Sequence, residues 1–360
     1  MWPDRRIIDL FGIDLPIIQA PMAGPVFADM VINVAEAGGL GSLPTATMSP
    51  DQARGELQII RQQTAKPINV NFFCHRAPEM DSAREEKWRA RLKPYYAEFG
   101  IDPAAPISSS NRAPFDESMC RLVEEFKPRV VSFHFGLPEQ ALLERVRATG
   151  ARIISSATSA DEAVWLEAHG CDAIIAQGAE AGGHRGIFLS EDPLRDASTQ
   201  AGTLALVPQV VDAVKVPVIA AGGIGDARGI VAAFALGASA AQLGTAYLFC
   251  PEARITPMHR AALRSAKDHV TALTNVFTGR PARGILNRAM RELGPITRDA
   301  PAFPLAGDAL SLLKAKTEAQ GSGDFGSLWS GQAARLGREM PAGDLTRALA
   351  AETLAKLSSR

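Results

Sequence analysis

The sequence predicts an α/β fold, a TIM (β/α)8 barrel with a helical insertion after strand 3 and a helical C-terminal extension. Eight short apolar runs alternate with longer amphipathic segments. The runs are apolar throughout rather than alternating, which is typical of parallel strands buried on both faces. Most runs begin 20 to 28 residues after the previous one, enough for one strand and one crossover helix. The chain of 360 residues can hold one such barrel and additional segments.

The eight strands are expected in chain order, each followed by a helix. They begin near Ile17, Leu40, Ile68, Val130, Arg152, Asp172, Pro217 and Ser239. Helices are expected over 28–37, 50–64, 138–149, 159–169 and 226–236, because each segment ends at or near a glycine, a lysine or a turn signal.

Two connections are longer than the rest. An insertion of about residues 74–114, rich in Arg, Glu and Pro, follows the third strand, and the loop after the sixth strand is extended around 178–188. We expect residues 1–250 to form the barrel and residues 251–360 to form a helical cap packed on it. Helices in the cap are expected near 257–267, 309–320 and 328–340.

Composition excludes several classes of partner. Lys plus Arg is 38 and Asp plus Glu is 39, which gives a net charge of −1 and no electrostatic reason to bind nucleic acid or an anionic membrane. No apolar run is long enough to span a bilayer, and the N-terminus has no signal-peptide core. The four cysteines are scattered without a CxxC pair, so we expect a reduced, cytoplasmic protein without disulfides: Cys74, Cys120, Cys171 and Cys250.

Polar and glycine residues gather at the ends of the predicted strands, where barrels bind their ligands. Amides, glycines and two of the six histidines share this position: 19–24, Asn71, His134, Gln177, Gly222, Gly223, Gln242, Gly244 and Thr245, with His184 in the loop after strand six. The other histidines fall in the insertion or on helical segments, where we expect structural or exposed roles: His75, His169, His259 and His269.

The glycines after the seventh and eighth strands predict a phosphate site. Gly222 and Gly223 let backbone N–H groups approach an anion, and the helix that begins near Asp226 directs its positive end there. Gly244 and Thr245 add amides and a hydroxyl. The alternative is that the glycines only form a tight turn. No GxGxxG fingerprint follows a strand and no P-loop is present, so a Rossmann site is not expected.

The two rim histidines suggest acid–base chemistry. His184 follows two glycines and precedes another, which allows the loop to lie close to a flat ligand and present an imidazole with an ordinary pKa near 6.5. The alternative is a solvated loop histidine. His134 lies between Phe133 and Phe135, and its alternative role is a core histidine bonded to backbone.

Other catalytic classes lack their residues. A zinc or iron site needs further His, Cys or carboxylate ligands, and the rim offers only amides, so we expect no catalytic metal. There is no GxSxG nucleophile, and Cys74-His75 at the start of the insertion is expected to have a packing role.

Several motifs in order resemble those of the FMN-dependent nitronate monooxygenases, formerly 2-nitropropane dioxygenases, in their class I branch. The resemblance extends from about residue 7 to the C-terminus. The motifs are IQAPM (18–22), VNFF (70–73), SFHFG (132–136), QGAEAGGHRG (177–186), AGGI (221–224), QLGT (242–245) and TGRPARG (278–284) with Asn287.

The resemblance implies FMN as cofactor and a role for each matching residue. Pro21 and Met22 would contact the isoalloxazine through backbone, and Asn71 and Gln177 would bond its polar edge. The ribityl phosphate and the ring would be held by Gly182, Gly222, Gly223, Gln242, Gly244 and Thr245. His184 matches the catalytic base and His134 a second active-site histidine. One departure is that 108–115 and 298–306 contain no tyrosine to line the substrate pocket.

The activity implied is oxidative denitrification of alkyl nitronates, and of nitroalkanes as a further substrate form, with O₂ to carbonyl compounds and nitrite. The nitro group would lie near His134 and His184, and His184 would remove the α-proton of a nitroalkane. We expect a monomer or homodimer. Two alternatives remain: an FMN-dependent NAD(P)H enoyl-acyl-carrier-protein reductase, which shares the AGGH loop, and a non-catalytic flavin-binding barrel.

Overall fold

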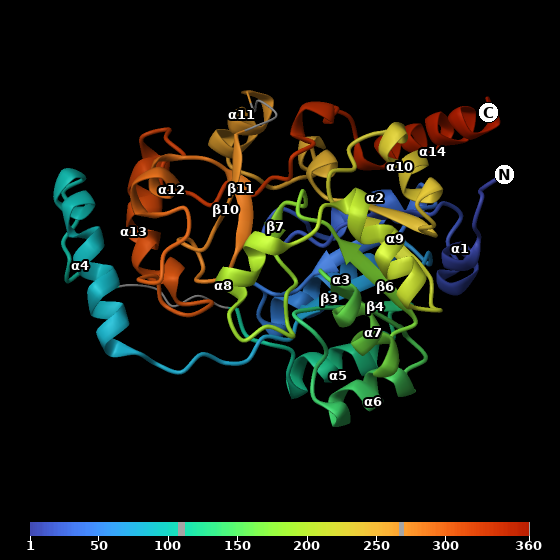
Figure 1. The fold of residues 1–360 in the computed structure, drawn as a ribbon, viewed down its shortest axis with the longest axis horizontal. Helices are drawn as coiled ribbons and strands as arrows, with labels where there is room; N and C mark the ends of the chain where they lie inside the picture. Colours follow the sequence, from blue (N-terminus) through green and yellow to red (C-terminus); the bar gives the residue numbers. More distant parts are fainter. Residues whose placement is uncertain (107–111, 266–269, 360) are drawn as a thin grey trace.

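The computed structural model describes residues 1–106, 112–265 and 270–359, and it contains the predicted barrel (Figure 1). Eight parallel strands are hydrogen-bonded in the order β1-β9-β8-β6-β5-β4-β3-β2, and a bridge between Ile18 and Leu40 joins the two ends. The strands are β1 (Ile17–Gln19), β2 (Gly41–Pro44), β3 (Ile68–Phe73), β4 (Val130–His134), β5 (Arg152–Ala157), β6 (Ala173–Gln177), β8 (Val218–Ala221) and β9 (Ala240–Leu243). Each begins within one residue of its predicted start, so the fold prediction is confirmed.

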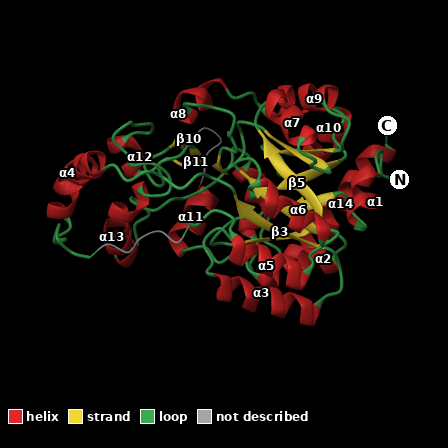
Figure 2. Ribbon diagram, turned by 90° about the horizontal axis from the view of Figure 1, so that it is seen from below, coloured by secondary structure: helices red, strands yellow, loops and turns green. Residues whose placement is uncertain are grey.

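Helices surround the strands (Figure 2). They include α2 (Ala28–Glu36), α3 (Pro50–Gln63), α5 (Glu117–Phe126), α6 (Gln140–Ala148), α7 (Ala160–Ala168), α9 (Thr203–Ala213) and α10 (Ala227–Ala235). The five predicted helices are present with ends that differ by at most two residues. Local signals explain this agreement: α3 starts with a capping box between Ser49 and Gln52, with Pro50 in its first turn.

The N-terminal end of the barrel is closed by an apolar plug. Helix α1 (Arg6–Phe11) places Ile7 and Phe11 in one buried cluster with Ile154 and Ile219 of the barrel strands. This packing removes apolar surface from water. Any site built from the strand ends therefore lies at the opposite, C-terminal face.

The insertion after β3 contains helix α4 (Ser82–Glu98), which packs on the C-terminal part of the chain (Figure 1). Its partner is α13 (Ala306–Ala319). Trp88 donates from Nε1 to the Ala306 carbonyl at 3.1 Å, and Tyr96 donates its hydroxyl to the Ala309 carbonyl at 2.5 Å. Residues 107–111 of the predicted insertion lie outside the described residues.

The prediction for the C-terminal segment is only partly right. Helices α11 (Pro257–Ser265) and α13 form near their predicted positions, and α12 (Arg288–Leu293) lies between them. Residues 271–274 and 282–285, however, form an antiparallel pair, β10 (Thr271–Thr274) and β11 (Ala282–Ile285). The helix predicted over 328–340 is wrong, because only the short 3₁₀ turn η3 (Ala334–Leu336) forms there. Pairing and packing with distant segments decide these conformations.

The last helix, α14 (Ala342–Ser358), completes the barrel. It packs against α10 and α2, and Leu345 and Leu349 join the main barrel core. Tyr247, in the turn η2 (Thr245–Phe249) after β9, bonds Thr346 of this helix at 2.8 Å. Helix α14 therefore contributes to the barrel core, although it lies about 100 residues after β9 in the chain.

Candidate active site

A cavity of about 480 Å³ opens at the C-terminal ends of the barrel strands. The structure brings all twelve predicted site residues to its lining: Pro21, Met22, Asn71, His134, Gln177, Gly182, His184, Gly222, Gly223, Gln242, Gly244 and Thr245. Residues of the C-terminal segment, among them Trp329 and Gly331, line it as well. The residues thus share one site, and what each of them binds remains a prediction.

One end of the cavity is built mainly from backbone. Gly222 and Gly223, after β8, have φ angles of +115° and +68°, which L side chains rarely adopt. A side-chain carbon at Gly182 would lie 2.6 Å from the Gly331 nitrogen. The Gly331 N–H donates to Thr245 Oγ1 at 2.8 Å. Absence of side chains therefore lets backbone from three distant segments meet here.

The sequence reasoning missed the third of these segments. Ser330, Gly331 and Ala333 line the cavity beside the predicted glycines. The pair Ser330-Gly331 was the available signal, because serine and glycine are poor residues for the middle of a helix. It was read instead as part of a helix over 328–340.

His184 also lines the cavity, from the two-residue strand β7 (Gly183–His184). This strand pairs antiparallel with β11, where His184 is opposite Ala282. The ring bonds through Nε2 to Thr278 Oγ1 at 2.9 Å. Aromatic rings surround it, with centroids 5.2 Å away for Phe303 and 5.5 Å for Trp329. The C-terminal segment therefore supplies much of the environment of this histidine.

His134 uses both ring nitrogens within the protein. Its Nε2 lies 3.2 Å from the His184 carbonyl oxygen and its Nδ1 lies 2.5 Å from Ser156 Oγ. A carbonyl only accepts, so Nε2 carries the hydrogen and the Ser156 hydroxyl donates to Nδ1. This arrangement matches the backbone-bonded alternative left open from the sequence, although one face of the residue lines the cavity.

Two amides near the histidines have different bonding. Gln177 donates from Nε2 to the His184 carbonyl at 2.9 Å and accepts the Gly186 N–H at 2.8 Å through Oε1. Gln177 therefore holds the His184 loop. Gln242 Oε1, in contrast, is buried and has no hydrogen-bond partner in the described part of the chain. A buried acceptor at the cavity is a position for a ligand donor.

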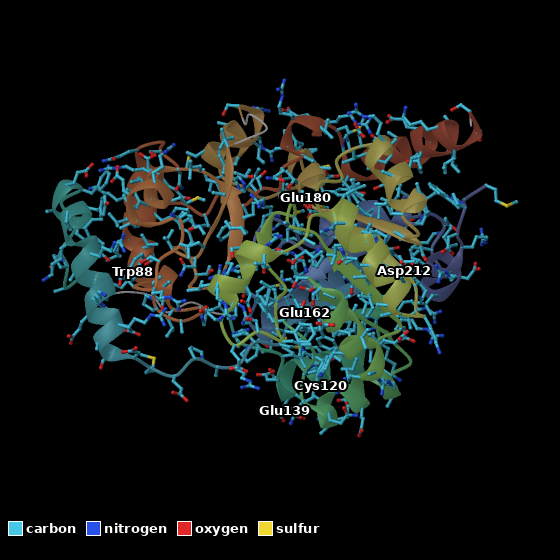
Figure 3. All side chains as sticks on the ribbon, viewed as in Figure 1. Trp88, Cys120, Glu139, Glu162, Glu180 and Asp212 are labelled. Atoms are coloured by element: carbon cyan, nitrogen blue, oxygen red, sulfur yellow. The ribbon has the colours of Figure 1, made fainter. Side chains whose placement is uncertain are left out.

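Two carboxylates, the buried Glu162 and the half-buried Glu180, anchor the same loop (Figure 3). Glu180 accepts the Thr203 N–H at 2.8 Å, and Glu162 accepts the Phe188 N–H at 2.7 Å. The figure labels both near the middle of the molecule, between the barrel and the C-terminal segment. The loop 178–188 is thus fixed at both of its ends.

One buried and one half-buried arginine, Arg185 and Arg280, supply positive charge around the histidines. Arg185 is fully buried, and its guanidinium donates to loop carbonyls, including Gly178 at 3.0 Å and Gly183 at 2.9 Å. The Arg280 guanidinium lies 4.3 Å from the Phe135 ring centroid and donates to the Ile187 carbonyl. Burial lowers the pKa of Arg185 to about 9 and that of Arg280 to about 10, so both are charged at neutral pH.

The histidines themselves are neutral. Burial, with the charges of Arg185 and Arg280, lowers the pKa of His134 to about 3. Burial also lowers the pKa of His184 well below its usual value, and Arg112, which lines the cavity, adds to this effect. The expectation of an ordinary pKa for His184 is wrong, because the sequence did not show its burial among arginines. At neutral pH both rings can accept a proton, and the site's positive charge lies on arginine.

The remaining histidines and cysteines lie in packed or surface positions. His75 is buried beside Phe303, where burial lowers its pKa to about 4. His259 is buried too, lines the cavity, and donates to the Trp329 carbonyl at 3.0 Å. His169 stacks on Trp165, and His269 lies outside the described residues. All four cysteines are free.

The described residues contain neither a metal-binding cluster nor a membrane-spanning helix. Within 1–106, 112–265 and 270–359, no cluster of three His, Cys, Asp or Glu residues could hold a metal ion. In those ranges no helix combines the length and apolar character needed to cross a membrane.

Comparisons with known proteins agree on one family. A sequence model of the nitronate monooxygenase family matches residues 4–352. The chain is 42% identical over 349 residues to a nitronate monooxygenase of Pseudomonas aeruginosa, covering 96% of this chain and 98% of the relative.

Solved structures give the same fold. A nitroalkane oxidase from Streptomyces ansochromogenes superposes with a TM-score of 0.88 at 37% identity, over 98% of this chain and 99% of the other. FabK from Thermotoga maritima superposes with a TM-score of 0.75 at 27% identity, over 100% and 98% of the two chains.

Proposed function

Because the chain belongs to the nitronate monooxygenase family, we propose that it is an FMN-dependent enzyme that oxidises alkyl nitronates with O₂ to carbonyl compounds and nitrite. The family is flavin-dependent. The observation that carries the proposal is the neutral imidazole of His184, held by Thr278 in a cavity surrounded by buried arginines. The positive charge of the arginines suits an anionic nitronate, and the neutral imidazole can remove a proton from the carbon of a nitroalkane.

The cavity residues fit FMN. The glycine end offers space that a side chain would fill, and Gln242 Oε1 is a buried acceptor for a ring donor. Gly223, Gly244 and Thr245 would hold the phosphate, because backbone amides near a helix N-terminus bind anions. When bound, FMN supplies the redox chemistry, and the protein supplies orientation and charge. Because the sequence has no Rossmann fingerprint that would bind the adenylate half of FAD, we propose FMN rather than FAD.

The other proposed contacts with FMN come from residues at the C-terminal ends of the barrel strands. Pro21 and Met22 would lie along the ring through backbone. Asn71 donates from Nδ2 to Ser132 Oγ at 2.9 Å, which fixes its side chain at the cavity wall. Its carboxamide oxygen and that of Gln242 would then bond the polar edge of the ring.

Buried charge favours the anionic form of the substrate. Arg112, Arg185 and Arg280 all depress histidine pKa values in the site, so the potential there is positive. Inside a protein such charges are screened less than at the surface. We therefore assign attraction of the nitro group to this arginine potential, and to neutral histidines only hydrogen bonding or proton transfer.

His184 would act only where a proton must be removed. A nitroalkane has to lose its α-proton, and a neutral, positioned imidazole is a suitable acceptor. A nitronate has already lost that proton. His134 and Gln177, which both bond the His184 carbonyl, would hold the base in place.

The proposal is tested by turnover without a nicotinamide cofactor. We expect the FMN-loaded protein to consume O₂ and release nitrite from ethylnitronate with no NAD(P)H present. Flavin released by heating should elute as FMN on chromatography. FAD in that eluate would contradict the cofactor, and absence of nitrite would contradict the reaction.

Two competing interpretations are distinguished by the same assays, and the similarity to FabK bears on the first of them. An FMN-dependent enoyl-acyl-carrier-protein reductase would reduce a crotonyl thioester with NAD(P)H, and a non-catalytic flavin barrel would do neither reaction. Location in the cytoplasm and a monomeric or homodimeric state stay predictions from the sequence.

A further inference from the structure

We propose that Thr278 is a positioning residue that sets the tautomer of His184. Its hydroxyl accepts a hydrogen bond from Nε2–H of His184 and donates to the Arg280 carbonyl, which leaves Nδ1 as the atom that takes the substrate proton. The inference rests on the proposed function, because it concerns the proton transfer from a nitroalkane to His184.

The contact geometry is compatible with these bond directions. Thr278 is 1% exposed, and its Oγ1 lies 2.9 Å from His184 Nε2 and 3.4 Å from the Arg280 carbonyl oxygen. A hydroxyl has one hydrogen to donate, and a carbonyl can only accept. If the hydrogen points to Arg280, the hydroxyl must accept from Nε2–H. The opposite order would place the ring hydrogen on Nδ1, which then could not accept a proton.

The turn that carries Thr278 is fixed independently of the histidine. Asn275 donates from Nδ2 to the Thr297 carbonyl at 2.7 Å and accepts the Thr297 N–H at 2.9 Å. The Gly279 N–H donates to the Asn275 carbonyl at 2.7 Å. Gly279 has φ of +91°, and a side-chain carbon there would lie 2.2 Å from the Pro301 carbonyl oxygen. Thr278 is therefore presented by a backbone that has little freedom to move.

The backbone of His184 is fixed as well. Pairing of β7 with β11 holds the strand, and Gln177 and His134 both bond its carbonyl. The remaining freedom is rotation of the ring, and the bond to Thr278 restricts it. A hydrogen bond to one imidazole nitrogen determines which nitrogen is basic.

The proton transfer balances on these atoms. The α-carbon–hydrogen bond of the nitroalkane breaks, the proton forms a bond with Nδ1, and the electron pair stays on the nitronate. His184 is then an imidazolium, and its Nε2–H bond to Thr278 becomes charge-assisted and stronger. Thr278 thus stabilises the charged ring formed by proton removal, a state that does not arise when nitronate is supplied.

The test compares Thr278→Val, which keeps the shape and removes the hydroxyl, with Thr278→Ser, which keeps the hydroxyl. For Thr278→Val we expect kcat/KM on nitroethane to fall about 10- to 100-fold, while kcat/KM on ethylnitronate falls much less. Thr278→Ser should restore most of the nitroethane activity. Thr353→Val is the matched control, since Thr353 is also fully buried and bonded, to the Leu349 carbonyl in α14. Equal losses on both substrates for Thr278→Val would overturn the proposal.

A second readout does not depend on turnover. The ¹⁵N chemical shifts of histidine-labelled, FMN-loaded protein distinguish the two imidazole tautomers, and His184→Asn identifies the signal of His184. We expect the Nε2–H tautomer in the unmodified protein and a mixture in Thr278→Val. An Nδ1–H tautomer in the unmodified protein would overturn the proposal even if Thr278→Val does not fold. Failure to oxidise ethylnitronate would instead contradict the proposed function and leave this measurement intact.

Discussion

Two parts of the cavity wall, which we call the glycine end and the histidine end, are built differently. At Gly222, Gly223 and Gly331 the wall is backbone, brought close because no side chain intervenes. At His184 the wall consists of side chains joined by hydrogen bonds and surrounded by buried arginines. Binding at the glycine end depends on the space that the missing side chains leave. We assign no titratable group to it. Catalysis at the histidine end depends on the protonation state of His184. Substitutions and changes of pH should therefore affect the two ends differently.

The largest effect is expected from His184→Asn. Asparagine keeps a polar side chain but cannot act as the base, so oxidation of nitroethane should fall by about 10²–10⁴-fold. Oxidation of ethylnitronate should fall far less. The measurement is steady-state O₂ consumption with each substrate form at matched FMN occupancy. Equal losses would show that His184 positions the substrate or cofactor and moves no proton.

The glycine end is tested by Gly223→Val. A β-branched residue there would adopt φ of +68° and place its Cβ 3.2 Å from that of Glu180, beside the proposed phosphate position. We expect FMN affinity to fall at least about tenfold, measured by fluorescence titration of the apoprotein. Full FMN occupancy in this variant would mean that the phosphate lies elsewhere.

A matched control separates backbone strain from lost space. Gly150 has φ of +86° and nothing within 4 Å of an added Cβ, and it is not part of the cavity. Gly150→Val therefore carries a similar conformational cost, of about 1–2 kcal/mol, and should retain FMN.

The acid side of the pH profile should reveal the neutral histidine. Because the pKa of His184 is lowered, the ring stays neutral below pH 6.5 and remains able to accept a proton. An ordinary histidine would lose about tenfold in its neutral form by pH 5.5. We expect the dependence of kcat/KM on nitroethane to be nearly flat over this range. A decline with an apparent pKa near 6.5 would contradict the burial of His184 in the working enzyme.

Buried neutral histidines should also make stability depend on pH. The pKa of His75 is about 4 in the folded chain, so the unfolded chain binds more protons below pH 6.5. Stability should therefore decrease as the pH falls from 6.5 towards 4, by up to about 1.4 kcal/mol per pH unit for each such histidine. Urea unfolding at pH 7 and pH 5 measures this. His75→Phe should show a smaller decrease than the unmodified protein, and an identical decrease would refute the assignment.

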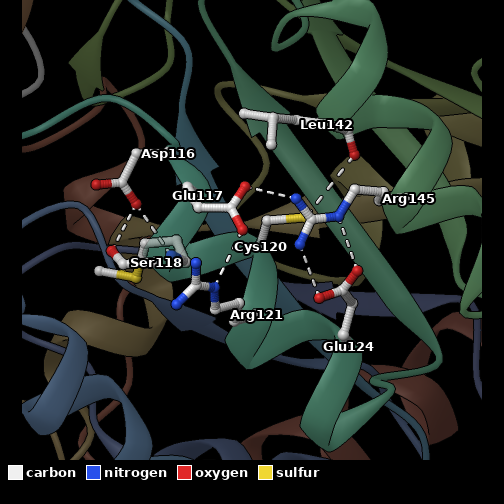
Figure 4. Close-up of polar contacts among 9 residues, drawn as sticks. Asp116, Glu117, Ser118, Cys120, Arg121, Glu124, Leu142 and Arg145 are labelled. Carbon is white, nitrogen blue, oxygen red and sulfur yellow. Dashed lines mark hydrogen bonds and ion pairs between the residues drawn. The ribbon is translucent and has the colours of Figure 1, made fainter.

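The smallest effect is expected outside the cavity, in an ion-pair network between α5 and α6 (Figure 4). Arg145 bonds Glu117 at 2.5 Å and Glu124 at 2.8 Å, all at the surface. Such pairs contribute little and are screened by salt. Arg145→Met should lower the melting temperature by about 1 °C or less and leave nitronate oxidation unchanged. A large decrease that persists in 1 M NaCl would contradict this view of the network.

The two ends also differ in how far the sequence predicts them. Gly222, Gly223 and Gly244 directly follow barrel strands, and Gln242 lies near the end of β9. Parallel strand ends meet at one face, so the convergence of these residues could be inferred from local patterns. The strands were predictable for the same reason, since each carries its own apolar run.

The surroundings of His184 could not be inferred in this way. Thr278, Phe303 and Trp329 reach the ring only because β7 pairs with β11 and the following segments pack over it. No local pattern reports such pairing between residues about 100 positions apart. The lowered histidine pKa follows from the same tertiary burial, and the backbone bonding of His134 was visible only as an alternative.

The most direct test of the proposed reaction assays the same FMN-loaded protein with ethylnitronate and, separately, with NADPH. We predict nitrite release and O₂ consumption from ethylnitronate in air without NAD(P)H. In the same time, anaerobic mixing with NADPH should leave the flavin absorbance unchanged. Rapid bleaching of that absorbance by NADPH, with reduction of a crotonyl thioester and no nitrite from ethylnitronate, would contradict the account and favour the reductase.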